Sequence, residues 1–378
     1  MKKLKIGLDA RFALGKRRGI GNYSLDLFRA MTNISDEFEF IFFSDRQDTE
    51  CLLRDLPNSK VRVIGPAFYP FWEQISLPIA LKRDQVQIFH AVGNTGPILL
   101  PKEMRRIVTI HDVMFLKSLH IVPESPSLYQ RLGRFYRSVI SPPVALRANL
   151  VLTVSNFSRQ DILDSILGLD PRKVEVIYNG LPSHFKHCPE PGEAHPLQGQ
   201  NYLLHLGALD PRKNTSLVVR SYLALKRQHL IDEHLVILGL ANLDALDLSD
   251  EELKEGKASI HTPGFVTDEI IPVYFRHSRA FLFPSLYEGF GIPLLEAMSC
   301  GTPIITSNST CLPEIAGGAT LLVNPRRADE FEKALLTLLD SVDLRTSLIT
   351  KGLCRIKDFS WEAIATKTLE SYKHIMHK

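Results

Sequence analysis

Two glutamates flank a glycine turn in the second half of the chain. Glu288 is followed at once by Gly289, Phe290 and Gly291, and Glu296 lies in the apolar stretch that comes next. Carboxylates accept hydrogen bonds in pairs, which suits the vicinal hydroxyls of a sugar or a ribose. Glycines let a phosphate or a sugar come close to the backbone. The stretch therefore predicts a sugar or phosphate site; the alternative is a turn whose glycines only pack and whose glutamates are solvated.

The residues around this turn predict how the glutamates are held. Residues 280–283 form a short, aromatic-rich apolar run that indicates a buried strand. Residues 292–300 have a helical apolar pattern, and Pro293 suits the first turn, where a missing N–H costs nothing. Gly301, followed by Thr302 and Pro303, ends the helix. We predict a strand, a glycine turn and a helix whose first N–H groups are left for a ligand.

Other polar residues also follow predicted strands. Arg212 and Lys213 lie between a strand and a helix, where two cations could clamp a diphosphate; a solvated surface turn is an equal alternative. His111 and Asp112 end an apolar strand. His111 could donate to a substrate or stabilise developing charge, or it could be a core histidine satisfied by its neighbours. Asp112 could orient His111 or cap the next segment.

Helices are predicted at residues 23–31, 72–82 and 128–140 from their patterns of apolar residues. Residues 9–22, before the first helix, should form a loop that contains several glycines. Pro78 should kink or end the second helix. Ser155 is the expected N-cap of the helix that follows it.

The alternation of strands and helices is interrupted once, at residues 183–200, which we interpret as a linker rich in proline, glycine and histidine. A length of 378 residues favours two domains, which we place at residues 1–182 and 201–360. Residues 361–378 should form a C-terminal helix that packs back towards the first domain. The pattern predicts an α/β protein with two doubly wound, Rossmann-like parallel sheets facing across a cleft. Ligands of such sheets bind beyond the carboxyl ends of the strands.

Residues 284–308, PSLYEGFGIPLLEAMSCGTPIITSN, closely resemble the E-x7-E signature of the retaining glycosyltransferases of family 4, which have the glycosyltransferase B fold. The resemblance covers nearly the whole chain and is strongest at residues 201–325. It implies that a nucleotide diphosphate sugar binds the C-terminal domain. A glycan or lipid-linked glycan acceptor would bind the N-terminal domain.

By the same resemblance, Glu288 binds hydroxyls of the donor hexose, Glu296 binds the ribose, and Arg212 and Lys213 hold the diphosphate. His111 would bond the donor sugar near the reacting carbon, so that His111 and Glu288 are the expected catalytic residues. The implied donor-binding residues are Gly21, Arg212, Lys213, Phe265, Val266, Glu288, Gly289, Phe290, Gly291, Ile292 and Glu296. The acceptor-binding residues that we expect are Gly19, Asn94 and Asp112.

The charge of the chain argues against one class of partner. A net charge of +3 and a pI of about 8.5 do not indicate a nucleic-acid-binding protein, but they are compatible with an anionic membrane surface. Lys16, Arg17 and Arg18 could meet lipid headgroups or an anionic acceptor, or could simply be solvated. No stretch has the length of a transmembrane helix, and the first apolar run is too short for a signal peptide. We expect a cytoplasmic protein, and contact with the inner face of the membrane stays open.

No cofactor and no metal ion is expected. The five cysteines are scattered without a zinc-binding spacing and are typical of reduced thiols. His184, His187 and His195 are better interpreted as residues of a solvated linker than as metal ligands. The DxD metal motif of the other large glycosyltransferase fold is not apparent. Arg212 and Lys213 could stabilise the leaving diphosphate instead.

The function that we infer is transfer of a hexose during synthesis of a cell-surface polysaccharide. The resemblance favours mannose from GDP-mannose, with glucose or N-acetylhexosamine from UDP as alternatives. A sugar-nucleotide epimerase and a phosphorylase are alternatives on the same fold, although no motif for a pyridoxal lysine is present. A glycoside hydrolase fits poorly, because its two carboxylates must face each other across the substrate. A catalytically inactive, nucleotide-sugar-binding scaffold is the alternative from a different class.

Overall fold

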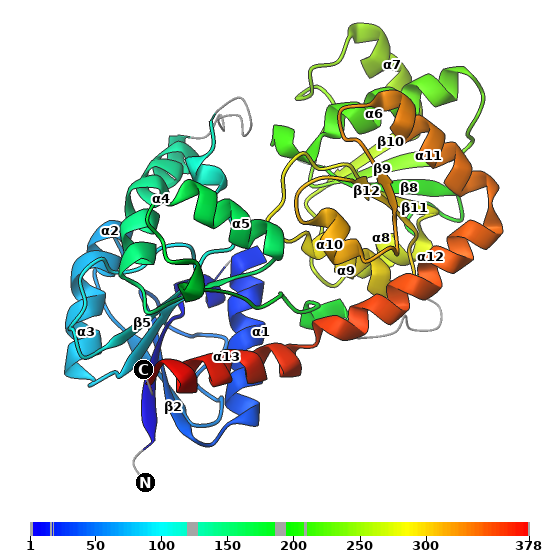
Figure 1. Ribbon diagram of the computed structural model, residues 1–378. Coiled ribbons are helices and arrows are strands. Elements are labelled where there is room, and N and C mark those ends of the chain that lie inside the picture. Colours follow the sequence, from blue (N-terminus) through cyan, green and yellow to red (C-terminus); the bar gives the residue numbers. More distant parts are fainter. Residues whose placement is uncertain are drawn as a thin grey trace. The chain divides into compact units, whose positions relative to one another are not determined.

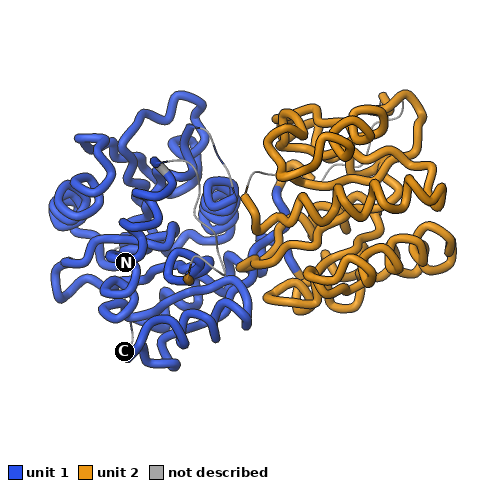
Figure 2. The backbone as a smooth tube through the Cα atoms, turned by 90° about the horizontal axis from the view of Figure 1, so that it is seen from above, with its two compact units in different colours: residues 1–117, 125–182, 359–378 blue, residues 118–124, 183–358 orange. Residues whose placement is uncertain are grey.

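The computed structural model describes residues 3–15, 17, 19–118, 128–185, 194–207 and 210–376. The chain divides into two compact units, shown in Figure 2. Unit 1 holds residues 1–117, 125–182 and 359–378, and unit 2 holds residues 118–124 and 183–358. Lys16, Arg18 and His187, named above, lie outside the described residues. Each unit contains one parallel sheet with helices packed on it, which confirms the predicted α/β class.

Unit 1 is built on seven parallel strands in the order β3-β2-β1-β4-β5-β6-β7. The strands are β1 (Leu4–Asp9), β2 (Phe38–Ser44), β3 (Ser59–Val63), β4 (Ile88–Ala91), β5 (Arg105–Thr109), β6 (Leu150–Thr153) and β7 (Val174–Val176). The order of the strands changes direction between β1 and β4, which pair with Ile6 opposite Ile88. In doubly wound sheets this is the point at which ligands bind.

Helices cover both faces of this sheet (Figure 1). They are α1 (Gly19–Ile34), α2 (Tyr69–Phe71), α3 (Leu77–Arg83), α4 (Leu128–Arg147), α5 (Asn156–Ser165) and α13 (Trp361–Met376). Alternate residues of β2 enter two cores. Phe40 and Phe42 pack with α1 and α13, whereas Ile41 and Phe43 pack with α3 and α4. Residues 40–43 of the strand are all apolar because both of its faces are covered there.

The C-terminal helix α13 packs on unit 1, although unit 2 precedes it in the sequence. The Trp361 side chain donates its Nε1–H to the Leu181 carbonyl oxygen at 2.7 Å, and its ring lies 5.8 Å from the ring of Tyr23 on α1. The Tyr372 hydroxyl lies 2.6 Å from Nδ1 of His90 on β4. These contacts join the last helix to the first helix and to the centre of the first sheet.

Three helical predictions in unit 1 need correction, and the first two concern α1 and α3. Helix α1 begins at Gly19, so the end of the predicted loop is the first helical turn. Gly21 permits this turn because a Cβ atom there would lie 2.4 Å from the Phe12 carbonyl oxygen. Pro78 does not end the helical run, which continues to Arg83. A π-helical turn (Trp72–Ser76) precedes α3, and Pro78 lies in the first turn of α3, where its missing N–H needs no partner.

Helix α4 also differs from the prediction, because it continues past residue 140 to Arg147 and includes Pro142 and Pro143. Val144 and Ala145, which follow the prolines, are fully buried in the core under the sheet. Burial of this segment outweighs the hydrogen bonds that the prolines remove. The prediction for Ser155 is confirmed, since its side chain accepts a hydrogen bond from Ser158 N at the start of α5.

Unit 2 is built on six parallel strands in the order β10-β9-β8-β11-β12-β13. The strands are β8 (Tyr202–Leu206), β9 (His234–Leu238), β10 (Ile260–Gly264), β11 (Ala280–Phe283), β12 (Ile304–Ser307) and β13 (Leu321–Val323). The helices are α6 (Thr215–Arg227), α7 (Asp250–Ser259), α8 (Ile271–His277), α9 (Ile292–Ser299), α10 (Leu312–Ala316), α11 (Ala328–Asp340) and α12 (Val342–Arg355). Here the strand order changes direction between β8 and β11. The predicted strand at residues 280–283 and the helix after the glycine turn are confirmed as β11 and α9.

Candidate functional site

The loops that follow β8 and β11 lie on either side of the switch in strand order of unit 2 and are bonded to each other. Leu286 N donates to the Arg212 carbonyl oxygen at 2.8 Å. The Asn214 side-chain amide donates to the carbonyl oxygens of Pro284 at 3.1 Å and Pro325 at 2.7 Å. Asn214 has φ +58°, a left-handed conformation that asparagine tolerates better than most residues. These bonds hold the Arg-Lys turn against the glycine turn.

The two cations of the first loop contact partners from both loops. Arg212 pairs with Asp210, with Nη2 and Oδ2 2.7 Å apart, and donates Nη1–H to the Tyr287 carbonyl oxygen at 3.1 Å. Lys213 Nζ lies 2.8 Å from Oε1 of Glu288, and the two side chains are only 22% and 13% exposed. The structure therefore brings the predicted diphosphate-binding lysine and the predicted sugar-binding carboxylate into one ion pair.

The glycine turn that carries Glu288 depends on Gly291. This residue has φ +87° at the start of α9, and a Cβ atom on it would lie 2.7 Å from Cδ2 of Leu312. On the other side, the Cys311 thiol donates to the Glu288 carbonyl oxygen at 3.2 Å. The close approach to Leu312, which only glycine permits, and the bond from Cys311 together fix the backbone from which the Glu288 side chain extends. Three other predicted donor-binding residues lie in the same turn: Gly289 and Phe290 are buried, and Ile292 is half-buried.

Glu296 lies on α9 in a half-buried position. Burial, together with the negative charge of Asp268, raises its pKa to about 8, although the positive charge of Lys213 acts in the opposite direction. The carboxyl group is therefore protonated at neutral pH and has an O–H donor as well as acceptor sites. Such a group can exchange hydrogen bonds with a diol without the cost of a buried charge.

Phe265 and Val266 follow the last residue of β10. Gly264 has φ +74°, and its carbonyl oxygen accepts a hydrogen bond from Gly239 N at 2.8 Å, so the turn is held to β9. The Phe265 ring is 88% exposed, and Val266 is half-buried. An exposed aromatic ring on a fixed turn is a suitable stacking surface for a planar base.

Together these loops of unit 2 present two cations, one ion-paired carboxylate, one neutral carboxyl group and an exposed aromatic ring. A nucleotide diphosphate sugar has matching parts: a diphosphate, hexose hydroxyls, a ribose diol and a base. The arrangement is thus suited to binding such a donor and to stabilising the charge of its leaving group.

In unit 1, His111 follows β5 and is 8% exposed. Its Nε2 lies 2.9 Å from the Val92 carbonyl oxygen, and its ring packs edge-on against Tyr23 at 4.7 Å. A carbonyl oxygen can only accept, so Nε2 carries the hydrogen and Nδ1 is left as an acceptor. Burial lowers the pKa of His111 to about 4, so the ring is neutral. Donation from Nε2 to a substrate, one of the predicted roles, conflicts with this geometry, whereas acceptance at Nδ1 agrees with it.

Asn94 and Asp112 flank His111 and bond to the backbone. The Asn94 side-chain oxygen accepts a hydrogen bond from His111 N at 2.7 Å, and Asn94 itself is 4% exposed with φ +69°. Asp112 Oδ1 accepts a hydrogen bond from Met114 N at 3.1 Å, which closes a turn onto the first residue of the short helix that follows. Both residues shape the loops at the sheet edge, and their contact with an acceptor stays a prediction.

Gly19 and Gly21 lie in the first turn of α1, after the β1 loop. Gly19 is exposed and a Cβ atom there would meet nothing within 4 Å, whereas Gly21 is buried beneath the Phe12 carbonyl. The N-terminal N–H groups of α1 therefore lie on the loop that follows β1, next to the switch between β1 and β4.

A buried charged cluster at the same edge of unit 1 was missed at the level of sequence. Arg11 Nη2 lies 2.7 Å from Asp9 Oδ2 and 3.3 Å from Glu73 Oε1, and the three side chains are at most 3% exposed. The Arg11 guanidinium lies 4.1 Å and 3.9 Å from the ring centres of Tyr69 and Trp72. The signal that could have indicated the cluster is the pair of charges, Asp9 and Arg11, at the end of β1.

His205 was missed as well. It lies fully buried in β8, with Nδ1 2.8 Å from the Leu282 carbonyl oxygen and Nε2 3.1 Å from the Thr215 hydroxyl. Burial lowers its pKa to about 4. His205 therefore links β8 to β11, the two strands at the switch in strand order, and also bonds the first residue of α6, which follows the Arg-Lys turn. A histidine inside an otherwise apolar strand was its signal in the sequence.

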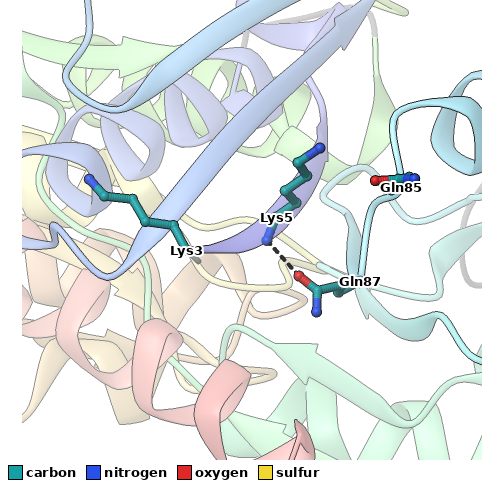
Figure 3. Close-up of a pocket in the computed structure, with 4 residues that line it drawn as sticks. All are labelled: Lys3, Lys5, Gln85 and Gln87. Carbon is teal, nitrogen blue, oxygen red and sulfur yellow. Dashed lines mark hydrogen bonds between the residues drawn. The ribbon is translucent and has the colours of Figure 1, made fainter. Parts of the chain in front are cut away.

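One pocket lies far along the strands from these residues. It is lined by Lys3, Lys5, Gln85 and Gln87 at the amino-terminal edge of the first sheet (Figure 3). Lys5 N donates to the Gln87 side-chain oxygen at 3.0 Å there. Because doubly wound sheets bind ligands at the opposite edge, we do not assign the site to this pocket.

The described residues hold neither a cluster of metal ligands nor a membrane-spanning helix. No group of three or more histidine, cysteine, aspartate or glutamate side chains is arranged there to hold a metal ion. None of the helices in the described ranges is both long and apolar enough to span a bilayer.

Known proteins match both units. Residues 192–353 match the family described as Glycosyl transferases group 1, and residues 17–184 match Glycosyltransferase Family 4. The O-antigen chain mannosyltransferase B of Escherichia coli is 32% identical over 306 residues, which is 78% of this chain and 76% of that protein. The O-antigen chain mannosyltransferase RfbU of Salmonella typhimurium is 25% identical over 340 residues, 85% of this chain and 88% of that protein. Among solved structures, sucrose-phosphate synthase from Thermosynechococcus elongatus superimposes with a TM-score of 0.74 at 18% identity, over 99% of this chain and 100% of that one.

Proposed function

The chain belongs to the group 1 glycosyltransferases of family 4, as its E-x7-E motif predicts, and on that premise we propose that it transfers mannose from GDP-mannose to a lipid-linked glycan. The reaction retains the anomeric configuration and extends a cell-surface polysaccharide. Glucose or N-acetylhexosamine from UDP is the second choice of donor. One observation carries the proposal: Arg212, Lys213 and Glu288 converge at the strand-order switch of unit 2.

The donor diphosphate binds the Arg-Lys turn. Arg212 is already oriented by Asp210 and the Tyr287 carbonyl oxygen, so little side-chain entropy is lost when it meets a phosphate. Lys213 has three N–H donors and can keep Glu288 while it binds a phosphate oxygen. These two cations neutralise the charge that develops on the leaving diphosphate.

The two glutamates bind different parts of the donor. Glu288 accepts hydrogen bonds from hexose hydroxyls, and its ion pair with Lys213 places the sugar next to the diphosphate. Glu296, neutral in the free protein, bonds the ribose hydroxyls, and Phe265 stacks on the base. Binding energy from the nucleoside thus positions the reacting carbon.

The acceptor binds unit 1, and His111 assists from there. Since Nε2–H of His111 bonds the Val92 carbonyl oxygen, Nδ1 is the ring atom that can accept a hydrogen bond from a substrate hydroxyl. No side chain in the described part of the site stands out as a covalent nucleophile. Retention then follows from attack by the acceptor on the face from which the diphosphate leaves.

The other activities that the sequence allows gain no support. An epimerase would turn over the donor without an acceptor, and a phosphorylase would need a bound pyridoxal group. The curated relatives are named as transferases and synthases, which supports transfer. An inactive scaffold would bind the nucleotide sugar without turnover on any acceptor.

The first test is thermal unfolding with GDP, UDP and ADP and their sugars. A ligand at about a hundred times its dissociation constant stabilises the folded state by about 2.7 kcal/mol. We expect a shift with GDP, lost in Arg212→Ala. Arg172→Ala is the matched control, because Asp170 and Arg172 form the same short turn at the exposed surface of unit 1. No shift with any nucleotide, or an equal loss in both variants, would overturn the assignment. The anomeric configuration of the product, read by NMR, then tests retention.

A further inference from the structure

Helix α4 carries an unusual outward face. A row of large apolar side chains, which we call the α4 stripe, lies on this face at helical spacing. Its members, with their exposed fractions, are Leu128 (67%), Leu132 (61%), Phe135 (69%), Val139 (51%) and Leu146 (41%). The opposite face of α4 packs on the sheet through Ile140 and Val144, which are at most 8% exposed. A helix that is apolar on its core side rarely carries a second apolar row towards the solvent.

A second exposed row, which we call the α2–α3 stripe, runs along the helical segment from residue 68 to residue 79. Its members are Phe68 (70%), Phe71 (46%), Ile75 (47%) and Ile79 (64%). Trp72 and Leu77 of the same segment, and Leu81 just after it, are fully buried. This segment therefore also has one apolar face in the core and one outside.

The two segments are neighbours in unit 1. The ring of Tyr69 lies 5.1 Å from that of Tyr136 on α4, and the Tyr136 hydroxyl donates to Glu73 at 2.6 Å. Gln74 donates to the Tyr136 hydroxyl at 3.1 Å and accepts from Ile98 N at 3.0 Å. Figure 1 shows α2, α3 and α4 on the same flank of the first sheet. Leu99, next to Ile98, is 75% exposed and adds to the apolar surface there.

The exposed charged side chains on these helices are all cationic. Helix α4 contains four arginines and no aspartate or glutamate. Helix α3 ends with Lys82 and Arg83. The one acidic residue of the α2–α3 segment, Glu73, is fully buried. Apolar side chains flanked by cations are the composition of segments that lie in the interface of an anionic bilayer.

We propose that the α4 stripe and the α2–α3 stripe together form a docking surface for a membrane that contains anionic phospholipids. The apolar side chains enter the boundary between headgroups and acyl chains. The exposed cations of the same helices, Arg131 and Arg147 of α4 and Lys82 and Arg83 of α3, contact the phosphates. The association is peripheral and reversible, because the apolar contribution comes from a few side chains and no helix enters the bilayer core. Salt weakens it, because part of the attraction is electrostatic.

The buried side chains of the same helices bond to the loop that carries Asn94, a predicted acceptor-binding residue. Glu73 accepts a hydrogen bond from Thr95 at 2.7 Å, and the neighbouring Asn94 holds the His111 backbone at 2.7 Å. The docking surface and the His111 loop are thus two sides of one packed layer. If the proposed function holds, docking presents lipid-linked acceptors to this unit; the docking itself does not depend on that function.

The test is cosedimentation of the purified chain with vesicles, without any sugar nucleotide. Vesicles of phosphatidylcholine alone are compared with vesicles that also contain phosphatidylglycerol. We expect binding to the anionic vesicles, with an affinity at least about ten-fold higher than for the neutral ones and a marked loss in high salt. The variant Leu132→Ser, Phe135→Ser, Val139→Ser should lose about ten-fold or more in affinity. These side chains are exposed, so folding is retained.

The control variant carries the same kind of change on unit 2: Leu322→Ser, Val342→Ser and Leu353→Ser, at positions that are 44%, 64% and 42% exposed. It should bind vesicles like the unchanged chain. Equal losses in both variants, or no binding of the unchanged chain to either vesicle, would overturn the proposal. A dimer in light scattering that only the α4 variant dissociates, without vesicle binding, would assign the surface to a second copy instead. The thermal shift that GDP produces is measured on the α4 variant as well. A variant that loses vesicle binding but keeps this shift has lost docking and kept the donor site.

Discussion

The ion pair between Lys213 and Glu288 gives a sharp test of the site. Its atoms are 2.8 Å apart, and the side chains are 22% and 13% exposed. At that distance the Coulomb attraction is about 1.5 kcal/mol in water and about 6 kcal/mol at an effective dielectric constant of 20. Desolvation of two mostly buried charges offsets much of the larger value. We therefore expect a coupling free energy of about 1–3 kcal/mol between the two side chains.

The measurement is a double-mutant cycle with Lys213→Met, Glu288→Gln and the double variant, followed by urea unfolding. Arg327 and Asp329 form the matched control pair in the same unit, 2.6 Å apart but largely exposed, and their coupling should be clearly smaller because water screens it. A coupling in the site pair no larger than in the control pair would refute the reasoning, since the pair would then not form in solution.

The same variants separate binding from chemistry. Glu288→Gln leaves Lys213 entirely to the diphosphate, so GDP affinity should change by less than about three-fold while turnover falls by about a hundred-fold or more. Lys213→Met should instead weaken GDP binding by about ten-fold or more. Nucleotide binding is read by titration calorimetry and turnover by release of the nucleotide. Loss of GDP affinity in Glu288→Gln that matches its loss of turnover would show that Glu288 does not act on the sugar.

Three further predictions concern the framework of the site. Gly291→Ala should lose about 2–4 kcal/mol of unfolding free energy in urea, from the positive φ and the contact with Leu312, and a loss below about 0.5 kcal/mol would contradict the turn geometry. The pKa of Glu296 is raised from 4.5 to about 8, so the folded state loses stability as the pH rises between these two values. Over this window the unfolding free energy of Glu296→Gln should rise relative to that of the unchanged chain, by on the order of 2–5 kcal/mol. A difference between the two proteins that does not depend on pH would disprove the shift. Arg11→Met should lower the unfolding free energy by about 3–5 kcal/mol in the same urea assay, because two buried carboxylates lose their cation. Adding Glu73→Gln to this variant should restore part of the lost stability. A purely steric role of Arg11 would not produce this recovery.

Local patterns in the sequence were sufficient for the elements that carry the donor site. The apolar run at residues 280–283, the glycines after Glu288 and the position of Pro293 each act within a few residues, so β11 and α9 follow from local backbone chemistry. The doubly wound fold follows in the same way, because alternation of strands and helices allows few topologies. The family resemblance rests on these same local residues.

The extent of several helices depended on contacts distant in the sequence. Burial of Val144 and Ala145 carries α4 through two prolines, and the contact of Gly21 with the Phe12 carbonyl begins α1 early. Neither effect is visible in a local pattern, because each depends on what the folded chain places opposite the residue. The same holds for α13, which returns to unit 1 through Trp361 and Leu181.

The chain contains the tetrapeptide Asp-Pro-Arg-Lys twice, at residues 170–173 and 210–213, and both copies form the same short turn with the same Asp–Arg hydrogen bonds. The first copy precedes β7, and its arginine is 90% exposed; the second follows β8, and its lysine meets Glu288 across 75 residues of sequence. The amino-acid sequence by itself determined the turn, the glycine turn and the strands that position them. Only the tertiary structure decided which copy faces a carboxylate at the strand-order switch, because that partner is brought in by the pairing of β8 with β11.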